Sequence, residues 1–198
     1  EILRALTRSD NSVHTLNVGN NTLTTLPPLL LRTCVETRTI QTLIMNNNCL
    51  QRLPEELDAI PLLHLNVSAN PYLKDQGIGQ SLPSTLLHLN LGKIGLSSVP
   101  TVVFQKLTQL TTLLLDGNSF EEDVSQYPWS NLRHLAELGL SMCHLKRFPI
   151  DLHHLRCLEI VDVSNNDITD VPPTIALSNS LKVLRLNGNG LKSIRYDV

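Results

Sequence analysis

The chain has 198 residues, of which 41% are hydrophobic, 17% are charged and only 4% are aromatic, and its formal net charge is −2. A nearly neutral chain of this kind offers no electrostatic basis for binding nucleic acid or an anionic membrane. It also has no uninterrupted apolar run of about 20 residues, so we expect no membrane insertion. A core with so few aromatic residues must be built from aliphatic side chains.

One pattern recurs eight times along the chain: apolar, two spacers, apolar, one spacer, apolar, two spacers, usually Asn, one spacer, apolar. The clearest copies are residues 110–120, 158–168 and 181–191. A repeat at this period is typical of a solenoid. We therefore predict one repeat domain over residues 1–198, whose copies begin at Val13, Ile40, Leu62, Leu86, Leu110, Leu135, Leu158 and Leu181, in steps of 22 to 27 residues.

The middle of each copy predicts a short strand, because alternate side chains of a strand point to opposite faces. In the fifth copy, Leu113 and Leu115 face inward, while Thr112, Leu114 and Asp116 face outward. One such strand per copy, stacked in parallel, gives a long sheet. The predicted fold class is an α/β solenoid: an arc with a parallel β-sheet on its concave face and short helical, 3₁₀ or irregular segments on its convex side.

The recurring asparagine explains the turn that follows each strand. Its amide both donates and accepts hydrogen bonds, so it can pair backbone groups inside the bend. The pattern departs from asparagine at Ile94 and at Cys143. A thiol is a weak donor, but isoleucine cannot donate, so we expect a local rearrangement or a water near Ile94. The predicted structural ladder is Asn21, Asn48, Asn70, Asn118, Asn166 and Asn189.

Proline follows the last apolar residue in several copies, as at Pro27 and Pro54, and suits the start of a helical turn. The connection over residues 28–39 is the longest and predicts a fuller helix. The fifth copy lacks the Leu-Pro step and places Trp129 near an acidic run. Trp129 could be part of an exposed interaction knob, or it could cover an irregular core on the convex side; we favour the core position.

These repeats resemble the leucine-rich repeat family over nearly the whole chain. The copies of about 23 residues with a Leu-Pro step resemble its intracellular class, which includes Ras-group and scaffold proteins. That resemblance implies binding of another protein or peptide, with no catalytic site. The chain shows no capping segment at either end, and terminal repeats normally need polar caps. We therefore expect it to be a fragment of a longer protein, which could carry a signal peptide or a catalytic domain.

The cysteines Cys34, Cys49, Cys143 and Cys157 form no C-x-x-C pair and do not cluster at an end of the chain. Extracellular proteins of the resembled family usually carry disulfide-bonded caps, so free thiols in a reducing, cytoplasmic compartment are expected here. The pattern places Cys34 and Cys157 on or near packed connections. An extracellular location stays open, because Asn20 and Asn66 each begin a glycosylation acceptor pattern.

The outward strand positions form two zones that we predict to bind the partner. One is a polar square of histidines and asparagines, and the other is a mildly acidic zone in which Asp162 and Arg185 are expected to pair. The alternative is a merely solvated sheet, with the partner held at an edge or loop. The predicted partner-binding residues are His64, Asn66, His88, Asn90, Thr112, Leu114, Asp116, Glu137, Asp162 and Arg185.

No phosphate loop, zinc-protease motif or serine elbow is present in the sequence. His64 and His88 on adjacent strands lack the further ligands that a stable metal site needs. We therefore expect no enzyme, no cofactor, no metal and no nucleic-acid partner, and a monomer in isolation. The predicted function is a protein–protein interaction scaffold. Its alternatives are a regulatory segment of a larger signalling enzyme (a kinase, GTPase or ubiquitin ligase) and an extracellular recognition receptor.

Overall fold

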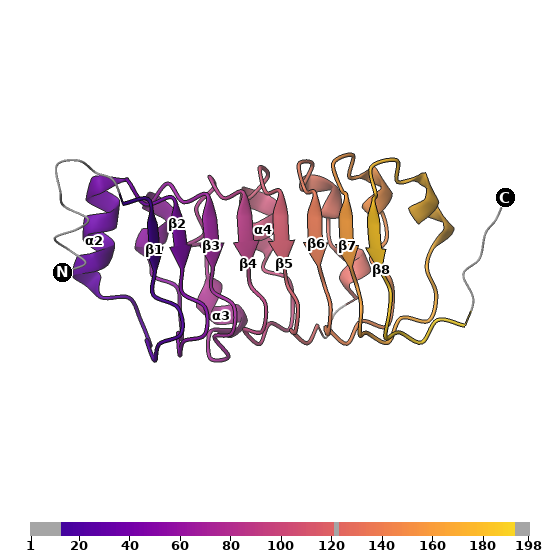
Figure 1. The fold of residues 1–198 in the computed structure, drawn as a ribbon, viewed down its shortest axis with the longest axis horizontal. Coiled ribbons are helices and arrows are strands. Elements are labelled where there is room, and N and C mark those ends of the chain that lie inside the picture. Colours follow the sequence, from indigo (N-terminus) through magenta and orange to yellow (C-terminus); the bar gives the residue numbers. More distant parts are fainter. Residues whose placement is uncertain (1–12, 121–122, 193–198) are drawn as a thin grey trace.

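The computed structural model describes residues 13–120 and 123–192, and within them the chain forms one parallel sheet. Figure 1 shows the strands side by side along the long axis of the molecule, in sequence order. The predicted solenoid with a parallel sheet is confirmed. The strands are β1 (Thr15–Asn17), β2 (Thr42–Ile44), β3 (His64–Asn66), β4 (His88–Asn90), β5 (Thr112–Leu114), β6 (Glu137–Gly139), β7 (Ile160–Asp162) and β8 (Val183–Arg185).

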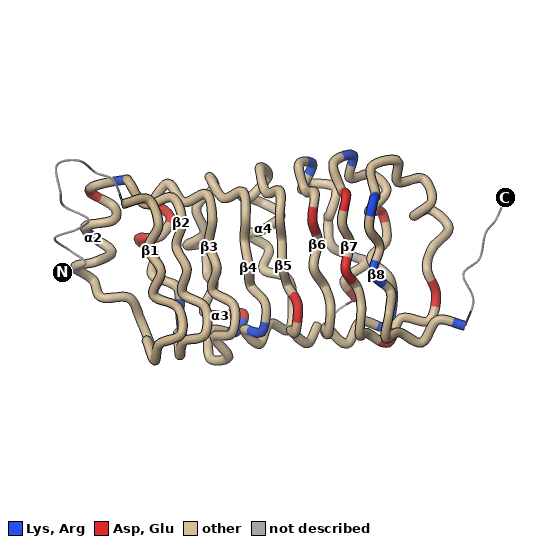
Figure 2. Tube along the Cα trace, viewed as in Figure 1, with Lys and Arg blue, Asp and Glu red and all other residues tan. Residues whose placement is uncertain are grey.

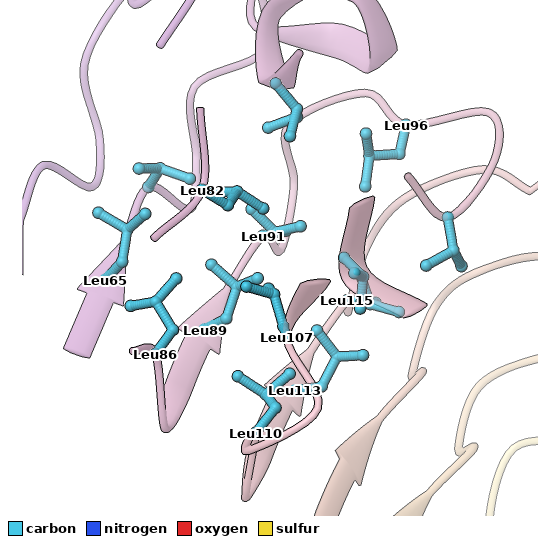
Figure 3. Close-up of a cluster of buried hydrophobic side chains, with 14 of the residues drawn as sticks. Leu65, Leu82, Leu86, Leu89, Leu91, Leu96, Leu107, Leu110, Leu113 and Leu115 are labelled. Carbon is cyan, nitrogen blue, oxygen red and sulfur yellow. The ribbon is translucent and has the colours of Figure 1, made fainter. Parts of the chain in front are cut away.

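The central residue of each strand from β1 to β7 is buried, and the first residue lies half-buried or exposed on the other face. We call this second face the concave face. The register aligns central residues with one another, as in Leu65 with Leu89 and Leu89 with Leu113. Figure 3 shows the resulting stack of leucines behind β3 to β5. Each fully buried leucine contributes about 1.5–3 kcal/mol, so the repeated leucines supply the core that the few aromatics cannot.

The connections return behind the sheet as short helices that pack against their neighbours. Proline stands directly before several of them, as expected for a residue that lacks an N–H and fixes φ. The fuller helix predicted over residues 28–39 is confirmed. The helices are α2 (Pro28–Thr37), α3 (Lys74–Ile78) and α4 (Thr101–Lys106), and the 3₁₀ turns are η1 (Glu55–Ala59), η2 (Val124–Gln126), η3 (Trp129–Asn131), η4 (Leu152–His154) and η5 (Pro173–Leu177).

The ladder asparagines pair the backbone of adjacent repeats. Asn118 donates its amide N–H groups to the carbonyls of Leu91 and Leu115, and its Oδ1 accepts from the backbone N–H groups of residues 94–96. The same two-repeat bonding occurs at the buried Asn48, Asn70 and Asn166 and at the half-buried Asn189. Asn21 is exposed, and its amide donates only within its own turn.

Replacing Asn118 with alanine is expected to lower the free energy of unfolding by about 3 kcal/mol, the upper end of the cost of an unpaired buried polar group. The side chain is 2% exposed, and five backbone groups would lose a partner. The midpoint of urea denaturation measures this effect. Asn21→Ala is the matched control, because water can replace its bonds. Equal midpoints for the two variants would contradict a structural role for the ladder.

The two departures from asparagine are resolved differently. At Ile94 a rearrangement is present: α3 follows Asn70, and the backbone N–H of Lys74 donates to the carbonyl of Ile94. At Cys143 the thiol lies 3.3 Å from the carbonyl oxygens of Leu115 and Ser141. Burial raises the pKa of Cys143 to about 12, so the thiol stays protonated and can donate in place of an amide.

The core position favoured for Trp129 is confirmed. Its side chain is 1% exposed, and its indole N–H donates to the carbonyl of Val124 at 2.8 Å. The ring packs edge-on against Phe104 and Tyr127, with ring centroids 5.3 and 6.1 Å away. The residues 121–122 of the neighbouring acidic run lie outside the described residues, as does the amino-terminal tail over residues 1–12.

The four cysteines are free thiols. Cys34 and Cys143 are buried and Cys49 is half-buried. Cys157 is exposed, at a turn in the connection between η4 and β7, and the neighbouring Leu158 is buried. Among the described helices, none has the length and apolar character needed to cross a membrane.

Candidate functional site

A hollow of about 360 Å³ lies on the concave face over β2 to β5. Each strand offers its first and third side chains to this face, and those of β2 to β5 line the hollow. Six of the predicted partner-binding residues line it. The prediction did not include Thr42 and Ile44, which also line it. Ile44 could have been found from the sequence, because it is an apolar residue at an outward strand position. The lining residues are Thr42, Leu43, Ile44, His64, Leu65, Asn66, His88, Leu89, Asn90, Thr112 and Leu114.

The imidazoles of His64 and His88 stack across the centre of the hollow. Their centroids are 4.3 Å apart and their planes are 8° from parallel, because the two residues are register partners on adjacent strands. Burial lowers the pKa of His88, the nearby His64 ring lowers it further, and Glu137 opposes the shift. Burial and the neighbouring ring thus favour the uncharged form of His88 in this stacked pair.

When the pH is lowered from 7.5 to 5.5, the natural chain is expected to lose more stability than the His88→Gln variant does. A histidine whose pKa is lower in the folded state contributes stability above its unfolded pKa of about 6.5, and this contribution is lost as the pH falls below that value and through the lower folded pKa. Thermal melting at the two pH values measures the difference. His134→Gln, at an exposed histidine, is the control and should follow the natural chain. Parallel curves for all three proteins would contradict the assigned shift.

The two asparagines of the hollow are oriented by their own backbone. The Oδ1 of Asn66 accepts from Ser68, and the Oδ1 of Asn90 accepts from the N–H of Gly92. Within the described residues, neither amide nitrogen has a hydrogen-bond partner, so both N–H groups remain for a ligand. A backbone carbonyl of an extended segment is the acceptor that such groups fit.

Asp116 is fixed at the carboxyl-terminal side of β5. One carboxylate oxygen accepts from the backbone N–H of Ser141 at 2.8 Å and from its hydroxyl at 2.9 Å. The carboxylate lies over Gly139 of the next strand, where an added Cβ would come within 2.6 Å of Oδ2. Gly139 therefore makes room for both Asp116 and Leu114, a role that the repeat pattern alone does not indicate.

The acidic zone divides into paired and unpaired carboxylates. The predicted pairing of Asp162 with Arg185 is confirmed at 3.7 Å, and Glu159 pairs with Lys182 at 2.7 Å. In the part of the chain that the structure describes, the carboxylates of Asp116 and Glu137 form no ion pair with a lysine or arginine. Figure 2 shows acidic positions just after β5 and on β6 and β7, and a basic position on β8, whereas β1 to β4 carry no lysine, arginine, aspartate or glutamate.

A larger hollow, of about 730 Å³, lies on the convex side among α2, η1 and α3. It arises because the ten-residue α2 packs against the five-residue η1. Its rim carries charged side chains that are solvated or already paired, as Asp58 is with Lys106. We therefore place the candidate site on the concave face.

Also on the convex side, Asp151, His153 and His154 bring three potential metal-ligating atoms within 4.8 Å of one another. The two imidazoles lie against each other, with ring centroids 3.9 Å apart. None of these three residues lines the concave hollow.

The chain is similar to known repeat proteins over most of its length, although no family model matches it. Tsukushi from Rattus norvegicus is 31% identical over 163 residues, which cover 81% of this chain and 46% of that protein. Transforming growth factor beta activator LRRC33 from Danio rerio is 24% identical over 200 residues, which cover 94% of this chain and 29% of that protein. The chain thus spans less than half of these relatives' length.

Two solved structures share the fold. Internalin C2 from Listeria monocytogenes superposes with a TM-score of 0.73 at 21% identity, over 91% of this chain and 74% of that chain. The Arabidopsis receptor kinase HAESA, solved in complex with the peptide hormone IDA and the co-receptor SERK1, has a TM-score of 0.68 at 22% identity. That match covers 92% of this chain and 35% of that chain.

Proposed function

We propose that this chain, a leucine-rich repeat solenoid, binds a segment of a partner protein on its concave face. The observation that carries the proposal is the hollow over β2 to β5, which combines the outward apolar side chains of Ile44 and Leu114 with oriented hydrogen-bond donors. Binding sites characteristically combine such a surface with a few placed polar groups. The site offers no nucleophile beside a base, so recognition rather than catalysis is the activity that it supports.

The occupant suited to this surface is an extended segment or loop. The hollow is open and continues along the sheet across neighbouring strands, so it can receive successive side chains of a chain lying over it. The free amide N–H groups of Asn66 and Asn90 would hold its backbone. HAESA, which has the same fold, was solved with a peptide hormone, and this supports a peptide-binding role for the present chain.

The cellular setting is a separate part of the proposal. The Leu-Pro repeats and the free thiols, with Cys157 exposed, support a cytoplasmic scaffold in a reducing compartment. Asn20 is exposed and supports the alternative of an extracellular receptor segment, whereas Asn66 lies in the hollow. Intact mass and glycan analysis of the native protein distinguish the cytoplasmic scaffold from the extracellular receptor. A glycan at Asn20 would favour the receptor, and four unmodified thiols would favour the scaffold.

Site-specific photo-crosslinking in cells tests the binding face. A benzoyl-phenylalanine at Thr112, in the hollow, is expected to yield a defined cross-linked protein. The same residue at Gln105, exposed on α4 behind the sheet, should not. Cross-linking from Gln105 but not from Thr112 would contradict binding on the concave face.

A further inference from the structure

We infer that the bound segment carries an apolar side chain that fills the hollow, followed by a lysine or arginine that contacts Asp116 and Glu137. This inference rests on the proposed function and specifies the chemistry of its partner. Two independent features support it: the uncharged lining of the hollow and the pair of carboxylates beyond one end of it.

The hollow selects an apolar group. Ile44 on β2 and Leu114 on β5 are the apolar outward side chains of its lining, and no residue of β1 to β4 is a lysine, arginine, aspartate or glutamate. An anchor side chain that leaves water here gains about 1.5–3 kcal/mol, the value for burying a large aliphatic or aromatic group. The stacked rings of His64 and His88 add flat aromatic surface to the same hollow.

The carboxylates select a cation. Glu137 is the register partner of Thr112, which lines the hollow, so it lies one strand beyond the hollow's edge. Asp116 is positioned at the end of β5 by its hydrogen bonds to Ser141. An arginine can contact such oxygens with two N–H groups, and a lysine acts as a point charge.

Two cations of the last repeats are already engaged. Arg185 on β8 contacts Asp162, and Lys182, which directly precedes β8, contacts Glu159. Asp116 and Glu137 are therefore the carboxylates of this face left for a partner's charge, among the residues that the structure describes.

The positions of the two features set the spacing of the motif. From the centre of the histidine pair, between β3 and β4, to Glu137 on β6 is about 2.5 strand spacings, or roughly 12 Å at about 4.8 Å each. An extended segment covers that distance in about three to four residues. Because alternate side chains point the same way, the cation is expected two or four residues from the apolar anchor.

Selection from a phage-displayed library of random dodecapeptides, with the purified chain as target, tests this motif. Enriched peptides are expected to carry an apolar residue and, two or four positions away, a lysine or arginine. The best peptide is then synthesised and titrated against Asp116→Asn/Glu137→Gln, which removes two charges while preserving side-chain shape. The matched control is Asp167→Asn/Asp170→Asn, which removes two exposed charges outside the strands.

We expect the charge-neutral site variant to bind the peptide at least tenfold more weakly, and the control variant to bind it as the natural chain does. A peptide with alanine at the basic position should bind both variants equally. If the enriched peptides carry no preferred lysine or arginine but bind the Leu114→Arg variant more weakly than the natural chain, the motif is wrong and binding on the concave face is retained. If no peptide is enriched, or binding ignores Leu114→Arg, both the motif and the proposed function are wrong.

Discussion

Replacing Trp129 with alanine is expected to lower the free energy of unfolding by about 3–5 kcal/mol, the usual cost of removing a large buried aromatic side chain. The fifth repeat lacks a Leu-Pro step, and the indole fills the space that regular aliphatic residues occupy elsewhere. Its hydrogen bond to Val124 and its contacts with Phe104 and Tyr127 would all be lost. Urea denaturation followed by circular dichroism measures the loss.

Two further variants make this result interpretable. Trp129→Phe keeps much of the ring volume and should retain more stability than the alanine variant. Tyr72→Ala removes an aromatic side chain that is 61% exposed and should change stability by less than about 0.5 kcal/mol. A Trp129→Ala protein as stable as Tyr72→Ala would show that the irregular fifth repeat does not depend on this side chain.

Substituting Leu114 with arginine is expected to weaken partner binding about a hundredfold, equivalent to about 2.7 kcal/mol. Central apolar anchors carry much of an interface's binding energy, and an arginine here would fill the hollow and place a cation beside the partner's basic residue. The fold should remain intact, because Leu114 faces outward from β5. Isothermal titration with the partner or with the selected peptide measures the affinity.

Leu177→Arg provides the matched control for this substitution. Leu177 is 62% exposed on η5, behind the sheet, so the same change of chemistry there should leave affinity unchanged. Melting curves of both variants establish that they are folded. Equal affinity of Leu114→Arg and the natural chain would contradict the placement of the partner over β5.

The sequence predicts much of this fold because its repeats are local and regular. The strand of the fifth copy lies at Thr112–Leu114, with Leu113 and Leu115 inward as the alternation requires. The helix over Pro28–Thr37 follows from the length of its connection and from the preceding proline. The outward direction of His64, His88 and Leu114 follows from the same alternation, so their gathering on one face is also predictable.

What the sequence does not predict depends on contacts between repeats. Where α3 replaces the usual return path, the backbone N–H of Lys74 donates to the carbonyl of Ile94, a contact that no pattern indicates. The space over Gly139 depends on how Asp116 turns toward Ser141. The sequence also does not show that Asp162 pairs with a cation whereas Asp116 and Glu137 do not, because this depends on side-chain distances between strands.

Methyl-group nuclear magnetic resonance tests concave-face binding most directly, with the chain titrated with the partner that cross-linking identifies. With isoleucine and leucine methyl groups labelled, the signals of Ile44 and Leu114 are predicted to shift on titration and to saturate with the bound fraction. The signals of Leu29 and Leu177, exposed behind the sheet at 61% and 62%, should stay in place. Shifts at Leu29 or Leu177, with Ile44 and Leu114 unchanged, would contradict the account.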